Sequence, residues 1–470
     1  MVAGLLKIFV MPEPIAKPAS ENMPVAILGV PFDSVSLAAA LDLVAGMVES
    51  GQPHYGTTVG VNFLVQAQTD VELRRILFDA HLVLAEEPPI VRASKLLGNP
   101  LQKSVTVPQL IPAVLALAEN RAWRVFLLGG GDAVVEKIRA RHPRLVVAGA
   151  FAPPEQPLLE MNHAEILQRV REAHPDVLLV AFGCPKQEKW INMNFREAAV
   201  PFMLGAGTAF DFATGQTVRR QSVGWSVRGK FWLAVLRQWW RLRLKKSSQP
   251  GPAAEVLPDP FGNFVVRAPA RLGATEAQAA KAEWLRAVEN GHVMFDLGET
   301  WFADSTGIGT LIRLRKRARE LGHQFFLVAP KPPVASALKL MKLDEFFNIQ
   351  TSTAGARILL EDARRTPMVT SGVEQNELRI NWSGEVTALN AVELGAHTDS
   401  ELTQATPGMT VVVNLSRLTF VDSTGIGLML RLKKNLARRG LTLQFQNPSA
   451  AVRNVLAHTR LEEYLLGEKK

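Results

Sequence analysis

Residues able to do chemistry follow an apolar run in the first half of this 470-residue chain. Segment 183–191 comes directly after the apolar residues 177–182 and contains Lys186, Gln187 and Glu188 in succession. A buried strand ending there would deliver a cation, an amide that both donates and accepts, and a carboxylate to one crevice. The segment is therefore a candidate ligand site.

Two glycine-rich segments follow other apolar runs. Gly129, Gly130 and Gly131 end one run and precede a predicted helix, where free backbone N–H groups and the helix dipole favour a phosphate. A glycine-rich turn without a ligand explains this segment equally well. Segment 205–215 contains Asp211, whose carboxylate could accept hydrogen bonds from a sugar or base, or could cap a turn.

The elements that would position these residues alternate between strands and helices. Continuous apolar runs predict strands of a parallel sheet covered on both faces, and apolar residues three and four apart predict helices. The predicted strands are 25–30, 82–85, 125–128, 145–147, 177–182 and 201–204, with helices such as 35–48 and 164–173 between them. The predicted fold class is α/β, an N-terminal Rossmann-like parallel-sheet sandwich with its ligand site beyond the carboxyl ends of the strands.

The second half of the chain is a tandem repeat. The hexapeptide Asp-Ser-Thr-Gly-Ile-Gly occurs at 304–309 and 422–427, and the similarity continues in constant register beyond it. Each copy predicts a small α/β domain with a mixed sheet. The expected domains are 1–246, 261–365 and 376–470, with a proline-rich linker at 247–260. Ser or Thr at the start of the helix after the hexapeptide could act as an N-cap, or could carry a phosphate.

Residues 219–246 form a basic tail without acidic residues. Helical spacing predicts one face with Trp225, Trp232, Trp239 and Trp240, and places basic residues such as Arg237 and Arg241 largely elsewhere. Tryptophan and basic side chains favour the surface of an anionic membrane. The alternatives are a core helix that docks on the first repeat, and a nucleic-acid-binding helix. Since no other segment resembles a nucleic-acid module, we expect no nucleic-acid partner.

The composition is that of a globular protein. Hydrophobic residues make up 47% of the chain and charged residues 21%, the net charge is +9, and no apolar run reaches the roughly 20 residues of a membrane span. The single cysteine, Cys184, excludes an internal disulfide and a cysteine-based metal site. We expect a cytoplasmic protein, peripheral at the inner face of the cell membrane.

The first half resembles the WecG/TagA/CpsF glycosyltransferases of family 26, at Asn62, segments 127–130, 185–191 and 210–215, and the basic tail. The resemblance implies transfer of N-acetylmannosamine or a related N-acetylhexosamine from a UDP donor to a polyprenyl-diphosphate-linked acceptor in exopolysaccharide or cell-envelope synthesis. It implies no metal or other cofactor, and Glu86 stands at the position of the catalytic aspartate. The implied nucleotide-sugar site consists of Asn62, Gly129, Gly130, Gly131, Lys186, Gln187, Glu188 and Asp211.

The chain departs from the pattern of this family at several positions. Gly60 replaces a threonine, Glu86-Glu87-Pro88-Pro89 replaces Asp-Gly-x-Gly, and Ser104, Val107 and Gln109 replace Arg, Gly and Asp. The two prolines predict a loop of different shape, because they fix φ and lack N–H donors. Two hypotheses follow: an active hexosyltransferase, or an inactive transferase domain in a signalling scaffold.

The repeated Phe-x-Asp-Ser-Thr-Gly-Ile-Gly pattern is similar to that of STAS domains, the fold of anti-sigma-factor antagonists. This resemblance implies phosphorylation of Thr306 and Thr424, with Ser305 and Ser423 beside them, and a STAS-binding protein or serine/threonine kinase as partner. Helix capping alone is the alternative role of these hydroxyls.

Overall fold

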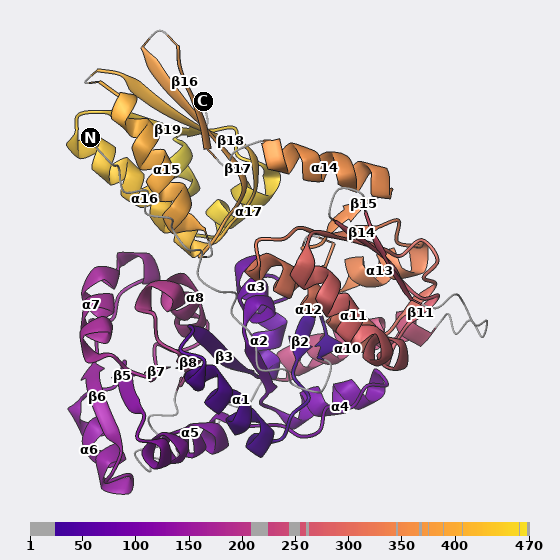
Figure 1. The fold of residues 1–470 in the computed structure, drawn as a ribbon. Helices are drawn as coiled ribbons and strands as arrows, with labels where there is room; N and C mark the ends of the chain where they lie inside the picture. Colours follow the sequence, from indigo (N-terminus) through magenta and orange to yellow (C-terminus); the bar gives the residue numbers. More distant parts are fainter. Residues whose placement is uncertain are drawn as a thin grey trace, which may run out of the picture.

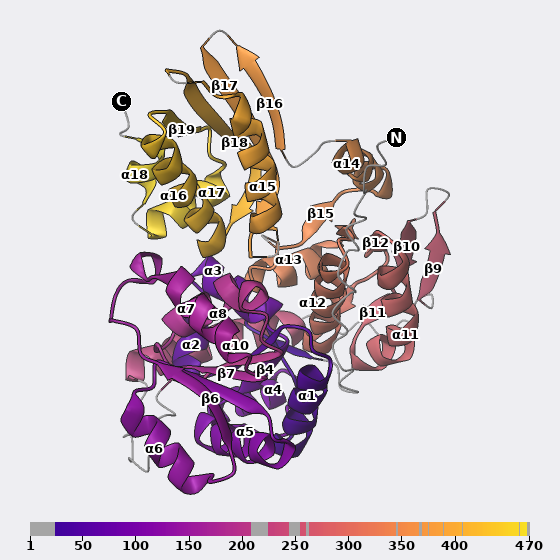
Figure 2. The ribbon, with the colours of Figure 1, turned by 60° about the vertical axis from the view of Figure 1, so that its left-hand side comes forward.

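The structure, a computed structural model, describes residues 24–207, 224–243, 254–259, 263–344, 346–365, 369–374, 376–388, 390–406, 408–459 and 461–467. The expected donor contact Asp211 lies outside these ranges. The chain forms an N-terminal domain and two repeat domains that both pack against it (Figures 1 and 2). None of the helices in the described ranges combines the length and apolar character needed to cross a membrane.

The N-terminal domain is built on a parallel sheet of six strands in the order β4-β3-β8-β7-β5-β6. The strands are β3 (His54–Val59), β4 (Leu82–Ala85), β5 (Arg124–Leu128), β6 (Val146–Phe151), β7 (Val177–Val180) and β8 (Phe202–Gly205). Apolar side chains of the central strands are buried on both faces, as continuous apolar runs predict.

Helices cover both faces of this sheet, so the expected α/β sandwich is confirmed. One face carries α1 (Leu37–Glu49), α5 (Val107–Arg121) and α6 (Asp132–Arg141). The other carries α2 (Val61–Gln66), α3 (Val71–Asp79), α4 (Pro88–Leu96), α7 (His163–Ala173), α8 (Lys186–Ala198) and α10 (Trp225–Arg243).

One strand of the sheet was missed, and one predicted strand was wrong. Strand β3 was missed because His54, Thr57 and Thr58 look polar, although all six of its residues are buried. Residues 25–30 do not join the large sheet: β1 (Val25–Ile27) and β2 (Val30–Phe32) form a separate antiparallel hairpin. Leu28 and Gly29 turn the chain there with φ of 50° and 84°, a conformation that favours glycine. The hairpin packs against the first repeat domain.

The first repeat domain has a mixed five-stranded sheet in the order β15-β14-β12-β10-β9, in which only β9 is antiparallel to its neighbour. Its strands are β9 (Glu255–Pro258), β10 (Phe264–Arg267), β12 (Val293–Asp296), β14 (Phe325–Val328) and β15 (Asn348–Gln350), with a small pair β11 (Arg271–Leu272) and β13 (Phe302–Ala303). Its helices are α11 (Ala274–Asn290), α12 (Ser305–Glu320), α13 (Pro332–Leu340) and α14 (Thr353–Arg365).

The second repeat domain has a mixed four-stranded sheet in the order β16-β17-β18-β19, again with one antiparallel pair at the edge. Its strands are β16 (Val369–Glu374), β17 (Glu377–Val386), β18 (Thr410–Val421) and β19 (Thr442–Gln446). Its helices are α15 (Ala391–Glu401), α16 (Ser423–Arg438), α17 (Ala450–His458) and α18 (Glu462–Leu466).

The sheets of both repeats begin earlier than expected from the sequence. β9 lies inside the segment taken as a linker, and β16 precedes the expected start of the second domain at 376. In both cases a short edge strand pairs antiparallel with the next strand. Proline and polar residues therefore mark these boundaries only approximately.

Candidate active site

The candidate site lies at the carboxyl ends of β4, β3, β8 and β7, which are four consecutive strands in the sheet. Glu86 follows β4 directly, and its backbone N–H donates to the carbonyl of Val59 at the end of β3 (3.0 Å). Gln187 and Glu188 lie in the first turn of α8, which follows β7. The sheet order thus brings together side chains that are about 100 positions apart in the sequence.

Gln187 and Glu188 are buried and hydrogen-bonded to each other at this edge. The Nε2 of Gln187 donates to Oε1 of Glu188 (2.8 Å), and Oε1 of Gln187 accepts from the backbone N–H of Gly207 (3.0 Å). Gly205 makes this packing possible, because a Cβ there would lie 2.6 Å from Nε2 of Gln187 and 3.0 Å from Oε1 of Glu188. The loop after β8 and the first turn of α8 are therefore joined through one amide.

Glu188 is the most strongly perturbed acid of the crevice. Its side chain is 5% exposed, and its Oε2 has no hydrogen-bond partner among the described residues. Burial raises its pKa from 4.5 to about 7; the charge of Glu86 also raises it, while the hydrogen bond from Gln187 lowers it. A carboxyl group in this state can carry a proton near neutral pH.

Glu86 and Glu87 have different environments although they are adjacent. Oε1 of Glu87 accepts from the backbone N–H of Val61 (3.1 Å) and so caps the first turn of α2. A Cβ at Gly60 would lie 2.7 Å from that same oxygen and 3.6 Å from Oε2 of Glu86. The family threonine at this position is thus replaced by a glycine whose missing side chain leaves room for both carboxylates.

The two prolines after these glutamates begin a helix instead of stiffening a loop. Pro88 and Pro89 occupy the first turn of α4, where a missing N–H costs nothing. Gln109, another departure from the family pattern, completes a capping box with Thr106 at the start of α5 (Oε1 to the Thr106 N–H, 3.2 Å). These substitutions therefore stabilise helix starts.

The other residues expected to bind the UDP-sugar follow strands of the same sheet. Asn62 is exposed in the first turn of α2. Gly129 has φ of 90°, and a Cβ there would lie 2.6 Å from the carbonyl oxygen of Ala181, so a side chain would not fit. Gly131 is the N-cap of α6, with open space around its Cβ position. Lys186 donates from Nζ to the carbonyl of Gln156, toward the loop after β6.

Sequence reasoning missed Glu87 as a structural partner of α2, although the adjacent acidic pair was visible. It also did not assign Cys184, which is exposed in the turn between β7 and α8. Partial burial raises the pKa of its thiol, and the charges of Glu188 and Glu86 raise it further. Across the described ranges, no three His, Cys, Asp or Glu side chains are grouped as a metal site requires.

Sequence models of known families match all three domains. Residues 25–246 match the glycosyl transferase WecG/TagA/CpsF family, residues 252–356 the STAS domain, and residues 370–467 the family described as Mlab, STAS domain. The chain joins a WecG/TagA/CpsF domain to two STAS domains. The resemblances inferred from the motifs are thereby confirmed.

Two solved structures of STAS proteins are similar to parts of the chain. One is an anti-sigma-factor antagonist (STAS) domain protein from Planctomyces limnophilus, 24% identical over 23% of this chain and 99% of its own, with a TM-score of 0.22. The other is the anti-sigma factor antagonist SpoIIAA in its unphosphorylated form, 24% identical over 22% of this chain and 89% of its own, with a TM-score of 0.19.

The basic tail of the WecG/TagA/CpsF domain forms α10, and one face of this helix is core. Phe231 and Val235 are fully buried, and Gln238 is 1% exposed. Oε1 of Gln238 accepts from the backbone N–H of Leu28 (3.0 Å), and its Nε2 donates to Oγ of Ser305 in the first STAS domain (3.4 Å). The alternative of a core helix that docks the first repeat is therefore correct for this face.

The opposite face of α10 is exposed and apolar. Its members are Trp225, Leu233, Leu236 and Trp240, exposed by 90%, 51%, 47% and 62%. Trp232 and Trp239 are partly buried against the domain core, so only two of the four tryptophans, Trp225 and Trp240, are exposed on this helix. Arg237 is exposed, and the side chain of Arg241 lies outside the described part of the chain.

In both STAS domains the aspartate of the hexapeptide caps the following helix. Oδ1 of Asp304 accepts from the N–H groups of Thr306 (2.8 Å) and Gly307 (2.9 Å), and Asp422 makes the equivalent bonds in the second domain. The expectation that Ser or Thr acts as the N-cap was wrong, since the preceding aspartate already satisfies these donors.

Two of the four predicted phosphoacceptors bond to the first domain: Ser305 to Gln238 and Ser423 to Glu72. Ser305, Thr306 and Ser423 are 0%, 6% and 4% exposed. Thr424 is partly exposed, but its Oγ1 is buried and without a hydrogen-bond partner among the described residues. A kinase would therefore reach the hydroxyl groups of Ser305 and Ser423 only after the STAS domains move away from the WecG/TagA/CpsF domain.

Proposed function

We propose that the first domain transfers an N-acetylhexosamine, of the N-acetylmannosamine type, from a UDP donor to a polyprenyl-diphosphate-linked acceptor in exopolysaccharide or cell-envelope synthesis. Membership of residues 25–246 in a glycosyltransferase family supports the general activity. The observation that carries the proposal is that Glu86, Gln187 and Glu188 follow the carboxyl ends of β4 and β7 at one edge of the same sheet, where Gln187 and Glu188 are buried and hydrogen-bonded to each other (2.8 Å).

The proposed reaction needs one base and several donors. Glu86 would take the proton of the acceptor hydroxyl while the oxygen of that hydroxyl attacks the anomeric carbon of the donor sugar. The bond from that carbon to UDP then breaks, and both of its electrons leave with UDP. Gln187 and Asn62 would hold the sugar nucleotide, and the backbone at Gly129–Gly131 would approach its phosphates. Asp211 remains a proposed sugar contact.

The exposed face of α10 supports attachment to a membrane surface, where a lipid-linked acceptor would lie. Tryptophan and leucine side chains favour the headgroup boundary, and Arg228, Lys230 and Arg237 on the same helix are exposed. Each basic residue near an anionic surface contributes about 1 kcal/mol. The buried face of α10 meanwhile keeps the helix attached to its own domain.

The STAS domains would couple this transferase to a STAS-binding protein or serine/threonine kinase. Phosphate on Thr306, Thr424, Ser305 or Ser423 would add roughly −1.5 to −2 charges beside Asp304 or Asp422. Such a charge would oppose the packing of these helix starts against the first domain.

Turnover of UDP-N-acetylhexosamine with a polyprenyl-diphosphate-linked acceptor tests the proposal. Glu86→Gln should lower kcat by about 10²–10⁴-fold while binding of UDP is retained, because it removes only the base. Glu87→Gln is the matched control, since an amide oxygen can still cap α2. Full activity of Glu86→Gln would refute Glu86 as the base. If the wild-type protein binds UDP but shows no turnover, the first domain binds nucleotide without acting as a transferase.

A further inference from the structure

A buried glutamate of the WecG/TagA/CpsF domain contacts the second STAS domain. Glu72 in the first turn of α3 accepts from the backbone N–H of Ser423 (2.6 Å) with Oε1, and the hydroxyl of Ser423 donates to the same oxygen. The side chains of both residues are buried, with 5% and 4% exposure. The first turn of α16 thus binds a carboxylate of its own chain.

The same glutamate also holds the helix that carries the donor-site residues. Its Oε2 lies 2.9 Å from Nζ of Lys189, which also pairs with Asp70 (2.8 Å). Burial lowers the pKa of Lys189, but the charges of Glu72 and Asp70 more than offset this and raise it, so the lysine is charged. Lys189 follows Glu188 directly in the first turn of α8.

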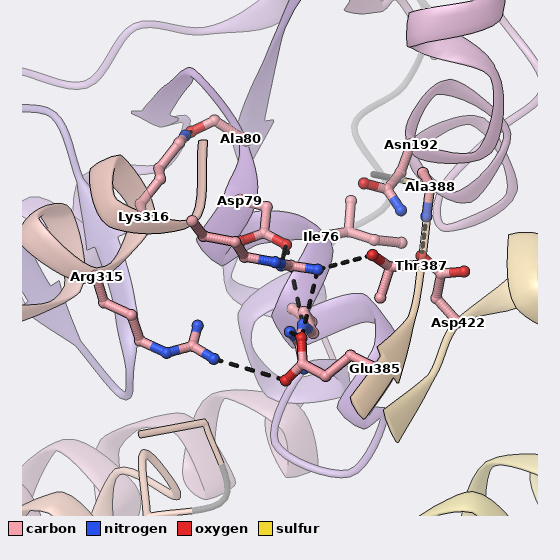
Figure 3. A network of polar contacts seen from close by, with 12 residues as sticks. Ile76, Asp79, Ala80, Asn192, Arg315, Lys316, Glu385, Thr387, Ala388 and Asp422 are labelled. Carbon is pink, nitrogen blue, oxygen red and sulfur yellow. Dashed lines mark hydrogen bonds and ion pairs between the residues drawn. The ribbon is translucent and has the colours of Figure 1, made fainter. Parts of the chain in front are cut away.

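A second cluster sets the orientation of the second STAS domain on α3, and Figure 3 shows its polar contacts. Glu385, at the end of β17, pairs with Arg75 of α3, while Arg315 of α12 lies 3.8 Å from its other oxygen. Arg319 of α12 donates to Asp79 of α3 (2.6 Å) and to the hydroxyl of Thr387 (2.8 Å). Both STAS domains therefore contact one face of α3.

We infer that Glu72 is the positioning residue through which the second STAS domain controls the nucleotide-sugar crevice. When this domain is docked, Ser423 and Lys189 hold the two oxygens of Glu72, and the first turn of α8 keeps Gln187 and Glu188 in place. When the domain leaves, Oε1 of Glu72 loses two donors, so Glu72 can shift and weaken the ion pair that holds Lys189 in the first turn of α8. The inference rests on the proposed function, because it assigns the regulation of that site, and it needs no particular modification.

The interface is also built so that it can open. A second carboxyl group, that of Asp422, is buried beside Glu72, and the pKa of Asp422 is raised to about 6 by burial and by the charge of Glu72. Docking brings the carboxylates of Asp422 and Glu72 together, and their repulsion at neutral pH opposes the docking of the second STAS domain. Added negative charge at Ser423 should therefore separate the domains.

Hydrogen exchange of the full chain tests the inference with Ser423→Asp. Ser416→Asp is the matched control, since it adds the same charge to an exposed residue of the same STAS domain. We expect exchange in α3 and in the first turns of α16 and α8 to rise about tenfold or more in Ser423→Asp only. Alkylation of Cys184, the single cysteine and an exposed one just before α8, should change in parallel.

The outcomes separate docking from control of the crevice. Faster exchange in α16 and α3 with unchanged α8 and Cys184 would overturn the inference, as would no change in any of these segments. Ser423→Ala, which removes only the hydroxyl, should give the same changes at smaller size and serves if the aspartate variant does not fold. Glu72→Gln should loosen α8 more than α16, because an amide can still accept from Ser423 but loses the charge that holds Lys189.

Titration with UDP distinguishes failure of this inference from failure of the proposed function. If the wild-type chain binds UDP, Ser423→Asp should weaken the affinity severalfold and Ser416→Asp should not. If the wild-type chain binds no UDP, the proposed function fails. The exchange and alkylation results still decide whether the STAS domain controls α8, since neither needs a ligand.

Discussion

Replacement of Glu188 by glutamine tests the electrostatics of the crevice directly. The folded protein holds the proton of Glu188 up to about pH 7, whereas the unfolded chain releases it near pH 4.5. A raised carboxyl pKa means that this group favours the folded state fully below pH 4.5, and that the advantage is lost as the pH rises to about 7. Glu188→Gln removes this titration because the amide stays neutral.

The magnitude follows from the two pKa values. Their difference corresponds to about 3 kcal/mol, since one pKa unit is worth about 1.4 kcal/mol. The free energy of unfolding of the variant, relative to that of wild type, should therefore rise by about 3 kcal/mol between pH 4 and pH 8. Any constant cost of the buried amide nitrogen cancels in this comparison.

Urea unfolding at pH 4, 5, 6, 7 and 8 measures this gain, with hydrogen exchange of peptides from β7 and α8 as the signal of the first domain. Glu136→Gln, on the exposed surface of α6, is the control and should show no comparable change with pH. A flat difference between Glu188→Gln and wild type, or one that falls as the pH rises, would refute the buried neutral carboxyl.

Three further predictions concern the crevice, the tail and the domain junction. Gly205→Ala should abolish stabilisation by UDP, because its Cβ would lie 2.6 Å from Nε2 of Gln187; Gly229→Ala in α10, with open space at its Cβ, should keep it in the same thermal-shift assay. Trp240→Ser should lower co-sedimentation with anionic vesicles severalfold without changing the melting temperature, because this side chain is 62% exposed. Glu385→Gln should loosen the second STAS domain by about 1–2 kcal/mol in urea unfolding, a modest value because its side chain is 31% exposed. Burial alone would raise the pKa of Glu385, but Arg75 and the neighbouring arginines lower it to about 2, so wild type should lose this contribution only as the pH falls from about 4.5 towards 2.

Much of the fold could be predicted because its signals are local. Five of the six predicted strands of the first domain coincide with β4, β5, β6, β7 and β8, at least in part. Strand β3 was missed because polar residues interrupt its apolar pattern, and its contacts are tertiary: the backbone N–H of Tyr55 donates to Nδ1 of His81 (3.1 Å) and its hydroxyl to the carbonyl of Ile76 (2.9 Å). The sequence pattern of residues 54–59 does not predict these contacts.

The same division holds for the candidate site. The succession Lys186, Gln187, Glu188 after an apolar run was readable, and the structure places the last two in the crevice. The role of Glu87 was not readable, because its bond to Val61 exists only when β3 and β4 are neighbours. Lys186 points to another loop, a direction that depends on the packing of α8.

The sequence by itself determined the three domains, their α/β class and the positions of their motifs, since periodicity and repetition are properties of neighbouring residues. Only the tertiary structure decided what those motifs touch. Ser423 and Glu72 are separated by 351 positions, and their bond forms because two folded surfaces meet. Such a contact depends on the shape and charge of complete domains, which no short segment encodes.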